Sequence, residues 1–178
     1  MAKGRAGKAG WPGRIRAAIP FRAVNRKGTN GYDAGLQRHH LLPRQLLSRS
    51  CFGRMFDSLG YKRVGFDDFR ANGLLLPANE NNALRTGMPL HRGPHREYND
   101  LVIHRVGTIE EQWTQDCERD PQTAMEDALF RLALLQSALR QRLLDERRRM
   151  VLNRKDPLGT GFDFSELDAM AAELWKAT

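Results

Sequence analysis

Two adjacent histidines, His39 and His40, stand in the sequence LQRHHLLP at residues 36–43. A second pair follows in HRGPH at residues 91–95, and NGLLLP at residues 72–77 lies between the two. Three imidazoles can hold a divalent cation with one coordination position left open, while a fourth stays free to take a proton. Because four of the five histidines fall into these clusters, the sequence favours a site that cuts a phosphodiester with a metal and a base.

The histidines at 91 and 95 are four residues apart, a spacing that places both rings on one face of a helix. Pro94 is compatible with the first turn of a helix, so we expect the pair to straddle a helix N-terminus. A protease of the His-Glu-x-x-His type needs a glutamate beside its first histidine, and Arg92 stands there instead. The two cysteines lie far from the histidines and from each other, which speaks against a zinc finger and favours reduced thiols.

These motifs resemble the AHH nuclease family of the HNH/endonuclease VII superfamily, which has the ββα-metal fold and is common as a toxin domain in bacteria. The resemblance covers residues 36–106 and rests on RHHLLP at 38–43, on FDD at 66–68 with ANGLLLP at 71–77, and on HRGPH at 91–95 with Tyr98. Arg38 stands where the family name expects alanine. The resemblance implies an α+β, mainly helical fold, with a small ββα-metal nuclease core and a C-terminal helical extension.

The resemblance also implies a role for each motif residue. His40 matches the general base that activates water, and Asn72 matches the asparagine that braces the segment carrying the base. The remaining motif histidines match the metal ligands: His39, His91 and His95. Basic residues beside the motifs are candidates for binding the phosphate: Arg38, Arg92 and Arg96. His104 falls outside the motifs and is expected to be an ordinary helix residue.

One divalent metal ion is expected as cofactor, and its identity stays open between Zn²⁺, Mg²⁺, Ni²⁺ and Mn²⁺. Three imidazoles suit Zn²⁺, Ni²⁺ or Co²⁺, whereas Mg²⁺ prefers oxygen ligands, yet related nucleases often work with Mg²⁺. A neutral imidazole with a pKa near 6.5 can accept a proton at pH 7. Neighbouring side chains of an extended segment point to opposite faces, so two adjacent histidines can take separate roles if they lie where the strand bends.

The charge is unevenly distributed. Residues 1–30 hold eight basic and no acidic residues, residues 31–106 hold eleven and seven, and residues 107–178 hold ten and fourteen. A basic arm and a basic centre attract phosphate backbones. The charge alone is equally compatible with a solvated, disordered N-terminus; it is the resemblance to a nuclease family that implies nucleic acid, in particular double-stranded DNA, as the partner. A toxin would also have a cognate immunity protein, whose acidic face would cover the basic centre.

No apolar run approaches the length of a membrane helix, so no membrane partner is expected. The N-terminus lacks the apolar stretch of a secretory signal. The expected location is the bacterial cytoplasm, or a target cell into which the protein is delivered without a classical signal peptide.

Three parts are expected along the chain: a basic flexible N-terminal arm (1–31), an AHH/HNH-like ββα-metal nuclease core (32–106) and a helical C-terminal extension packed on the core (107–178). Within the core, the pattern predicts an extended segment at the double histidine, a helix over about 44–59, a strand at 74–76, an asparagine-rich loop and a helix over about 94–105.

The extension is predicted to be helical. Thr108 with Glu111 has capping-box spacing, and Asp120-Pro121 is an N-cap followed by a proline at the first helical position. The long helix that follows carries apolar residues at helical spacing: Met125, Leu129, Leu132, Leu139 and Leu143. A last helix is expected over 165–175. The extension lies beyond the resemblance, which ends at Val106, and inherits no role from it.

A second interpretation is a non-catalytic nucleic-acid-binding or interaction protein, in which the metal is structural and the cleft is inert. An intact His40 favours the enzyme, because a structural site has no need of a free imidazole beside its ligands. Cleavage of DNA with and without a chelator separates the two.

Overall fold

In the computed structural model, residues 17–153, 155–159 and 169 are described. They form an α+β, mainly helical fold around a two-stranded antiparallel sheet, which confirms the expected fold class. Strand β1 (Leu36–His40) pairs with β2 (Gly73–Pro77), so that His39 lies opposite Leu74 and His40 opposite Gly73. The strand expected at 74–76 is therefore confirmed and is one residue longer at each end.

Short helices fill the chain between the two strands: the 3-10 helix η2 (Arg44–Ser48), α1 (Ser50–Leu59), α2 (Tyr61–Val64) and α3 (Phe69–Asn72). The single helix expected over 44–59 is thus divided. Arg49, which lies between its two parts, has an extended backbone with φ −88° and ψ 118°. The apolar face of α1 is buried at helical spacing: Phe52, Met55, Phe56 and Leu59.

The asparagine-rich stretch after β2 was predicted to be a loop, but it forms a helix, α4 (Glu80–Thr86). This prediction was wrong. The side chain of Asn79 accepts a hydrogen bond from the backbone N–H of Asn82 and caps the helix. Asparagine is a favoured N-cap because its side-chain oxygen satisfies a donor that lacks an intrahelical partner. The stretch therefore marks a helix start. The helix ends at Gly87, whose φ of 69° is left-handed.

Helix α5 (Arg96–Cys117) runs without a break through the positions where two helices were expected. The capping box at Thr108 is absent, because the Thr108 hydroxyl donates to the carbonyl of His104 inside the helix. Helix α6 (Pro121–Leu144) begins as predicted, with the Asp120 side chain accepting from the backbone N–H groups of the first turn.

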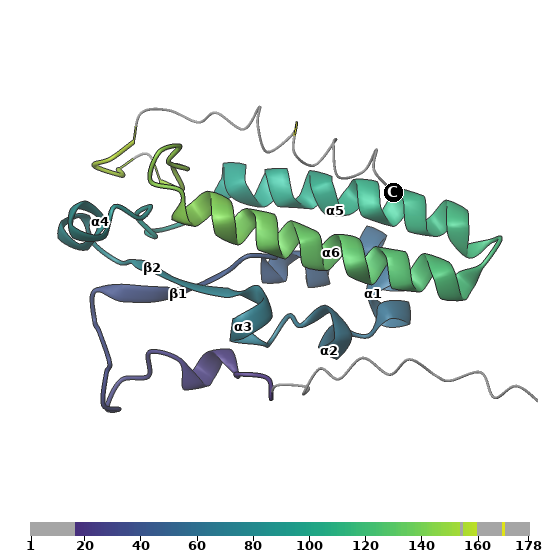
Figure 1. Ribbon diagram of the computed structural model, residues 1–178, viewed down its shortest axis with the longest axis horizontal. Coiled ribbons are helices and arrows are strands. Elements are labelled where there is room, and N and C mark those ends of the chain that lie inside the picture. Colours follow the sequence, from purple (N-terminus) through teal and green to yellow (C-terminus); the bar gives the residue numbers. More distant parts are fainter. Residues whose placement is uncertain (1–16, 154, 160–168, 170–178) are drawn as a thin grey trace, which may run out of the picture.

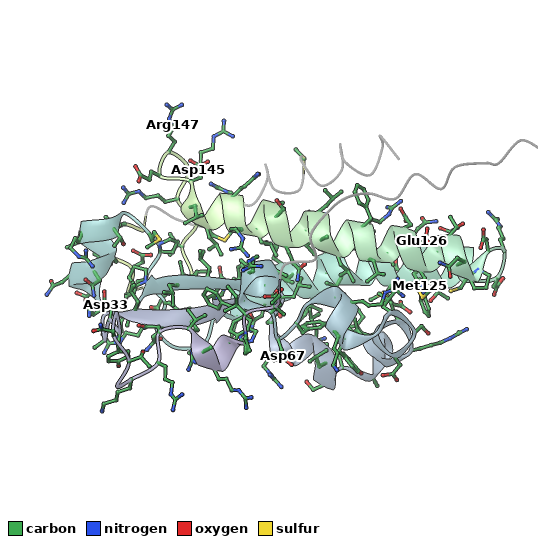
Figure 2. The ribbon with its side chains drawn as sticks, turned by 60° about the horizontal axis from the view of Figure 1, so that its bottom comes forward. Asp33, Asp67, Met125, Glu126, Asp145 and Arg147 are labelled. Carbon is green, nitrogen blue, oxygen red and sulfur yellow. The ribbon has the colours of Figure 1, made fainter. Side chains whose placement is uncertain are left out.

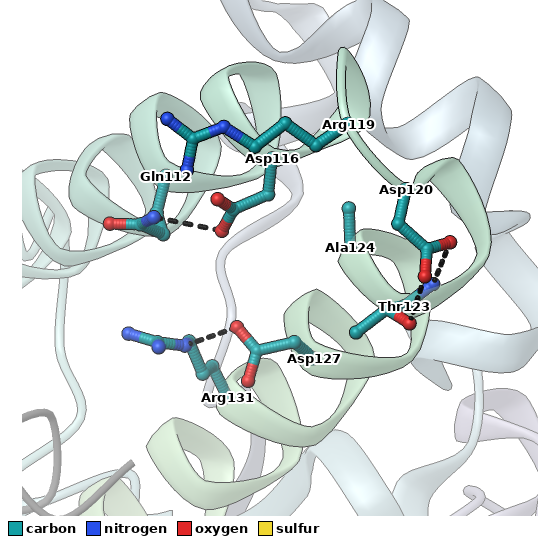
Figure 3. A pocket seen from close by; sticks show the side chains of 8 residues that line it. All are labelled: Gln112, Asp116, Arg119, Asp120, Thr123, Ala124, Asp127 and Arg131. Carbon is teal, nitrogen blue, oxygen red and sulfur yellow. Dashed lines mark hydrogen bonds and ion pairs between the residues drawn. The ribbon is translucent and has the colours of Figure 1, made fainter.

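Helices α5 and α6 lie side by side above the sheet and the short helices (Figure 1). The apolar stripe of α6 faces this core, with Leu132, Leu139 and Leu143 buried and Met125 and Leu129 partly buried. Near the turn that joins the two helices, an open polar pocket contains two pairs of bonded side chains, Gln112 with Asp116 and Arg131 with Asp127 (Figure 3). Among the described helices, none is long and apolar enough to cross a membrane.

The chain leaves α6 at the end that carries Asp145 and Arg147, opposite the end that carries Met125 and Glu126 (Figure 2). It then turns back into the molecule. Met150, Val151 and Leu152 are buried, and the segment lies at the same end of the molecule as α4 (Figure 1). The helix expected over 165–175 falls outside the described residues. Cys51 and Cys117 are both free thiols, as expected.

The expected flexible arm is held on the core from Ala17 onward. The Ile19 N–H donates to the Asp68 carboxylate at 2.9 Å, and the Phe69 N–H donates to the Ile19 carbonyl at 2.7 Å. A guanidinium N–H of Arg70 donates to the Ala17 carbonyl at 3.2 Å. These contacts hold residues 17–23, here called the N-terminal strap, next to the short helices. Residues 1–16 lie outside the described residues, and the division into three parts stays a prediction.

Candidate active site

Three of the four clustered histidines converge on one point. His39 comes from β1, His91 from the loop before α5, and His95 is the N-cap residue of α5. Their possible ligand atoms all lie within 4.8 Å of one another. The ring centroids of His91 and His95 are 4.4 Å apart, and those of His39 and His91 are 5.0 Å apart.

The pair at 91 and 95 does not meet on a helical face, as its spacing had suggested. Helix α5 begins only at Arg96, so Pro94 stands before the helix. The loop turns at Gly93, which has a left-handed φ of 79°. This turn, and not helical periodicity, brings the two rings together.

His39 is buried, with 3% of its surface exposed. Its Nε2 atom is buried and has no hydrogen-bond partner among the described residues. Burial, followed by the neighbouring His91 and His95, lowers the pKa of His39 well below its usual value. A neutral, buried imidazole nitrogen without a partner is what a metal ligand requires, because the ligand must be deprotonated.

The other two rings are oriented by acceptors on their Nδ1 side. Nδ1 of His91 lies 3.0 Å from the side-chain oxygen of Gln37, and Nδ1 of His95 lies 3.3 Å from the carbonyl of Leu152. With the proton on Nδ1, each Nε2 keeps its lone pair for a metal. Burial, followed by the nearby His95 and His40, lowers the pKa of His91 to about 4. Burial also lowers the pKa of His95, against the opposing effect of the Leu152 carbonyl. The three residues therefore fit a divalent cation that accepts imidazole ligands.

His40 is the last residue of β1 and stands outside the group of possible metal ligands. Its half-buried ring is stacked on Phe21 of the N-terminal strap, with centroids 3.7 Å apart and an interplanar angle of 2°. Burial and the positive charge of Arg44 lower the pKa of His40, while Asp67 opposes them. The imidazole is therefore neutral at pH 7 and able to accept a proton.

Asn72 is completely buried and is hydrogen-bonded to the segment that follows His40. Its Oδ1 accepts from the Leu42 N–H at 2.6 Å, and its Nδ2 donates to the carbonyls of Leu42 and Phe66. Gln136 of α6 donates to the same Oδ1 at 3.3 Å. Asn72 thus ties the chain two residues after His40 to α3 and α6.

A steric constraint explains why glycine follows Asn72. A Cβ atom at Gly73 would overlap the Phe69 ring. That ring packs edge-on against Phe21, with centroids 5.1 Å apart. Gly73 therefore leaves room for the Phe69 ring, which packs against the Phe21 ring on which His40 is stacked.

The three arginines named from the sequence are all exposed. Arg38 donates to the carbonyl of Phe21 at 2.8 Å and so also holds the N-terminal strap. Arg92 lies in the loop between the two histidines, and Arg96 is the first residue of α5. His104 is exposed on α5, as expected of an ordinary helix residue.

Several residues of the site were not assigned a role from the sequence. Tyr98 belongs to the third motif, and its hydroxyl donates to the Leu41 carbonyl while its ring packs edge-on against His39. Gln37, a neighbour of the double histidine, orients His91. Phe21 and Leu152 lie in the parts expected to be an arm and an extension, and no motif marks either of them.

A family model matches residues 20–139 of the chain, and its description is AHH, a nuclease family of the HNH/ENDO VII superfamily with conserved AHH. The match takes in most of the N-terminal strap, both strands, α5 and most of α6. It reaches well beyond Val106, where the motif-based resemblance ended, so the part of the helical extension up to residue 139 belongs to the matched region. No curated protein and no solved structure matches the chain.

Proposed function

Because the chain belongs to the AHH nuclease family of the HNH/ENDO VII superfamily, we propose that it is a metal-dependent endonuclease that hydrolyses phosphodiester bonds of double-stranded DNA. One observation carries the proposal. Three imidazoles converge within 4.8 Å, and a fourth, adjacent in sequence, stands outside them with its pKa lowered. This is the separation of ligands from base that the reaction needs.

His40 is the proposed general base. Its neutral imidazole takes the proton of the attacking water, and the stacked Phe21 ring keeps the imidazole in a fixed plane. Asn72 holds the backbone after His40 through its paired hydrogen bonds with Leu42, so the base cannot drift from its position. A base positioned in this way typically contributes about 10²–10⁴-fold to the rate.

His39, His91 and His95 are the proposed metal ligands. When bound there, a divalent cation supplies charge stabilisation for the phosphate and the departing 3′-oxygen. Three imidazoles favour Zn²⁺ or Ni²⁺ over Mg²⁺ and Mn²⁺, because Mg²⁺ prefers oxygen ligands.

The substrate is proposed to lie across the exposed basic residues beside the site: Arg38, Arg92 and Arg96. Each can donate paired hydrogen bonds to a phosphate. The toxin-type resemblance extends the proposal to an antibacterial effector that acts in the bacterial cytoplasm, either of the producing cell or of a target cell. A cognate immunity protein with an acidic face would then cover these arginines and block the substrate.

Removal of the metal is expected to abolish cleavage. Supercoiled plasmid incubated with the protein should be nicked and linearised, an excess of chelator should stop the reaction, and adding back Zn²⁺, Ni²⁺, Mn²⁺ or Mg²⁺ should restore it. Gel electrophoresis measures the products, with single-stranded DNA and RNA as parallel substrates. Binding of DNA without cleavage under all four metals would favour the non-catalytic interpretation instead.

Deleting residues 1–16 is expected to weaken DNA binding and to flatten its salt dependence. This deletion removes five basic residues and leaves the N-terminal strap on His40 in place. Each phosphate contact that is lost reduces the slope of log K against log salt by about 0.9 for duplex DNA. Affinities at several salt concentrations, with His40→Ala in both proteins to prevent cleavage, measure the slopes. Equal slopes would show that this segment does not contact phosphates.

A further inference from the structure

The chain beyond α6 returns to the loop that carries two of the proposed metal ligands. Residues 150–153 and 155–159, here called the C-terminal brace, pack against residues 87–95, here called the ligand loop. Met150, Val151 and Leu152 are buried in the brace, and Leu90 of the ligand loop is fully buried as well, with its backbone N–H bonded to Asp156 of the brace. The side chain of Asn153 lies next to Gly93 of the loop. The brace begins eleven residues after the last residue that the family model matches.

The first contact fixes a proposed ligand directly. The carbonyl of Leu152 lies 3.3 Å from Nδ1 of His95 and can only accept a hydrogen bond. It therefore selects the tautomer that carries its proton on Nδ1 and leaves Nε2 free. A carbonyl in this position also sets the rotation of the ring, which is the usual role of the group behind a metal-bound histidine.

The second contact fixes the loop. One carboxylate oxygen of Asp156, which is 8% exposed, accepts from the buried Leu90 N–H at 2.8 Å. The other oxygen accepts from the Leu158 N–H at 3.0 Å, inside the brace. The Asp156 N–H in turn donates to the Asn153 carbonyl at 2.9 Å. A single side chain therefore joins the turn that follows Leu152 to the residue that precedes His91.

We propose that the C-terminal brace positions the metal-binding site, with the Leu152 carbonyl orienting His95 and the Asp156 carboxylate holding the ligand loop. Both are positioning groups, because neither touches the substrate or offers an atom to the metal. This proposal assumes one part of the proposed function, namely that the three histidines bind a divalent cation. It adds to the site a segment that lies outside the family match.

The variant Asp156→Asn tests the brace. Asparagine has the shape of aspartate but only one acceptor oxygen, so it cannot accept from both Leu90 and Leu158. We expect the affinity for Zn²⁺ to fall because the loop that carries His91 and His95 is held less firmly, by at most the roughly 10–100-fold that is lost when a group directly behind a metal ligand is removed. Titration of metal-free protein against a chromophoric chelator measures it. Glu118→Gln, which removes one negative charge from the exposed end of α5, is the matched control and should bind Zn²⁺ like the wild type.

Amide hydrogen exchange of the metal-free proteins gives a local measurement. The Leu90 amide should exchange faster in Asp156→Asn than in the wild type, because its buried acceptor has been weakened. Faster exchange at Leu90 with an unchanged Zn²⁺ affinity would overturn the proposal, since the brace would then hold the loop without serving the site. Unchanged affinity and unchanged exchange would overturn it as well.

A measurement on the wild type covers the case in which Asp156→Asn fails to fold. A segment that favours metal binding must itself be favoured by the metal, because coupling between two sites is reciprocal. Zn²⁺ should therefore slow exchange of the Leu158 and Gly159 amides, which are hydrogen-bonded within the brace. The Tyr32 amide, in a turn before β1, is the internal control. No slowing at Leu158 and Gly159 would overturn the proposal.

These outcomes are distinct from a failure of the proposed function. If the wild type binds Zn²⁺ and Asp156→Asn binds it more weakly, the proposed role of the brace is supported even when no plasmid is cut. If the wild type cuts plasmid but Asp156→Asn binds Zn²⁺ as tightly as the wild type, the proposed role of the brace is wrong and the proposed nuclease function is supported. A wild type that binds none of the four metals would overturn both.

Discussion

His40→Ala is expected to lower the rate of DNA cleavage by about 10²–10⁴-fold, the usual contribution of a general base. The reason is geometric and electrostatic. His40 stands outside the three converging histidines, and burial together with Arg44 lowers its pKa, so the ring is unprotonated at pH 7. Single-turnover cleavage of a labelled duplex, at saturating protein and metal, measures the chemical step.

Metal binding separates loss of the base from loss of the site. His40→Ala should bind Zn²⁺ with wild-type affinity, because its ring is not among the ligand atoms that lie within 4.8 Å of one another. His104→Ala, a change on the exposed face of α5, is the control for cleavage and should match the wild type. A His40→Ala protein that keeps more than a tenth of the wild-type rate would remove His40 from the role of base.

Loss of one proposed metal ligand should strongly reduce the affinity of the protein for Zn²⁺. We expect His39→Ala to weaken Zn²⁺ binding by more than about 100-fold, beyond the roughly 10–100-fold that follows from losing a group behind a ligand. His39 is the most buried of the three ligands, and its Nε2 has no other partner among the described residues. Competition titration measures the affinity, and cleavage should be lost in parallel.

The other histidines provide the comparison. His91→Ala and His95→Ala should also weaken Zn²⁺ binding, whereas His104→Ala should not. Circular dichroism confirms that each protein is folded, which matters because alanine at the buried His39 also leaves a cavity. Equal affinities across all four variants would mean that the three histidines do not form a metal site.

The strands and the family could be predicted because they depend on local sequence. The double histidine in β1, the Asn-Gly at the start of β2 and the Asp120-Pro121 start of α6 each act through their nearest neighbours in the chain. Prediction from local sequence failed where one sequence pattern is compatible with two kinds of local structure. The asparagines after β2 suit a loop and a helix cap equally well. Thr108 has capping spacing, but the chain around it continues a helix already under way.

The contacts that complete the candidate site act over long distances in the chain and leave no pattern in it. Phe21 stacks on His40 where Arg38, Asp68 and Arg70 hold the N-terminal strap. Leu152 acts through its carbonyl, which every residue type has, so its identity carries no signal for His95. Such contacts become visible only when the fold brings the two segments together.

The hydrogen bonds from Gln136 to Asn72 and from His95 to the Leu152 carbonyl also depend on the order in which the chain is synthesised. A ribosome adds about 5–20 residues per second, so roughly 3–11 s separate the translation of His95 from that of Leu152. Throughout that interval the nascent polypeptide carries its histidines without the last groups that orient them. On the proposals made above, a chain released early by a premature stop codon never acquires the complete centre. On these proposals, the complete centre forms only after translation has passed Leu152 and Asp156.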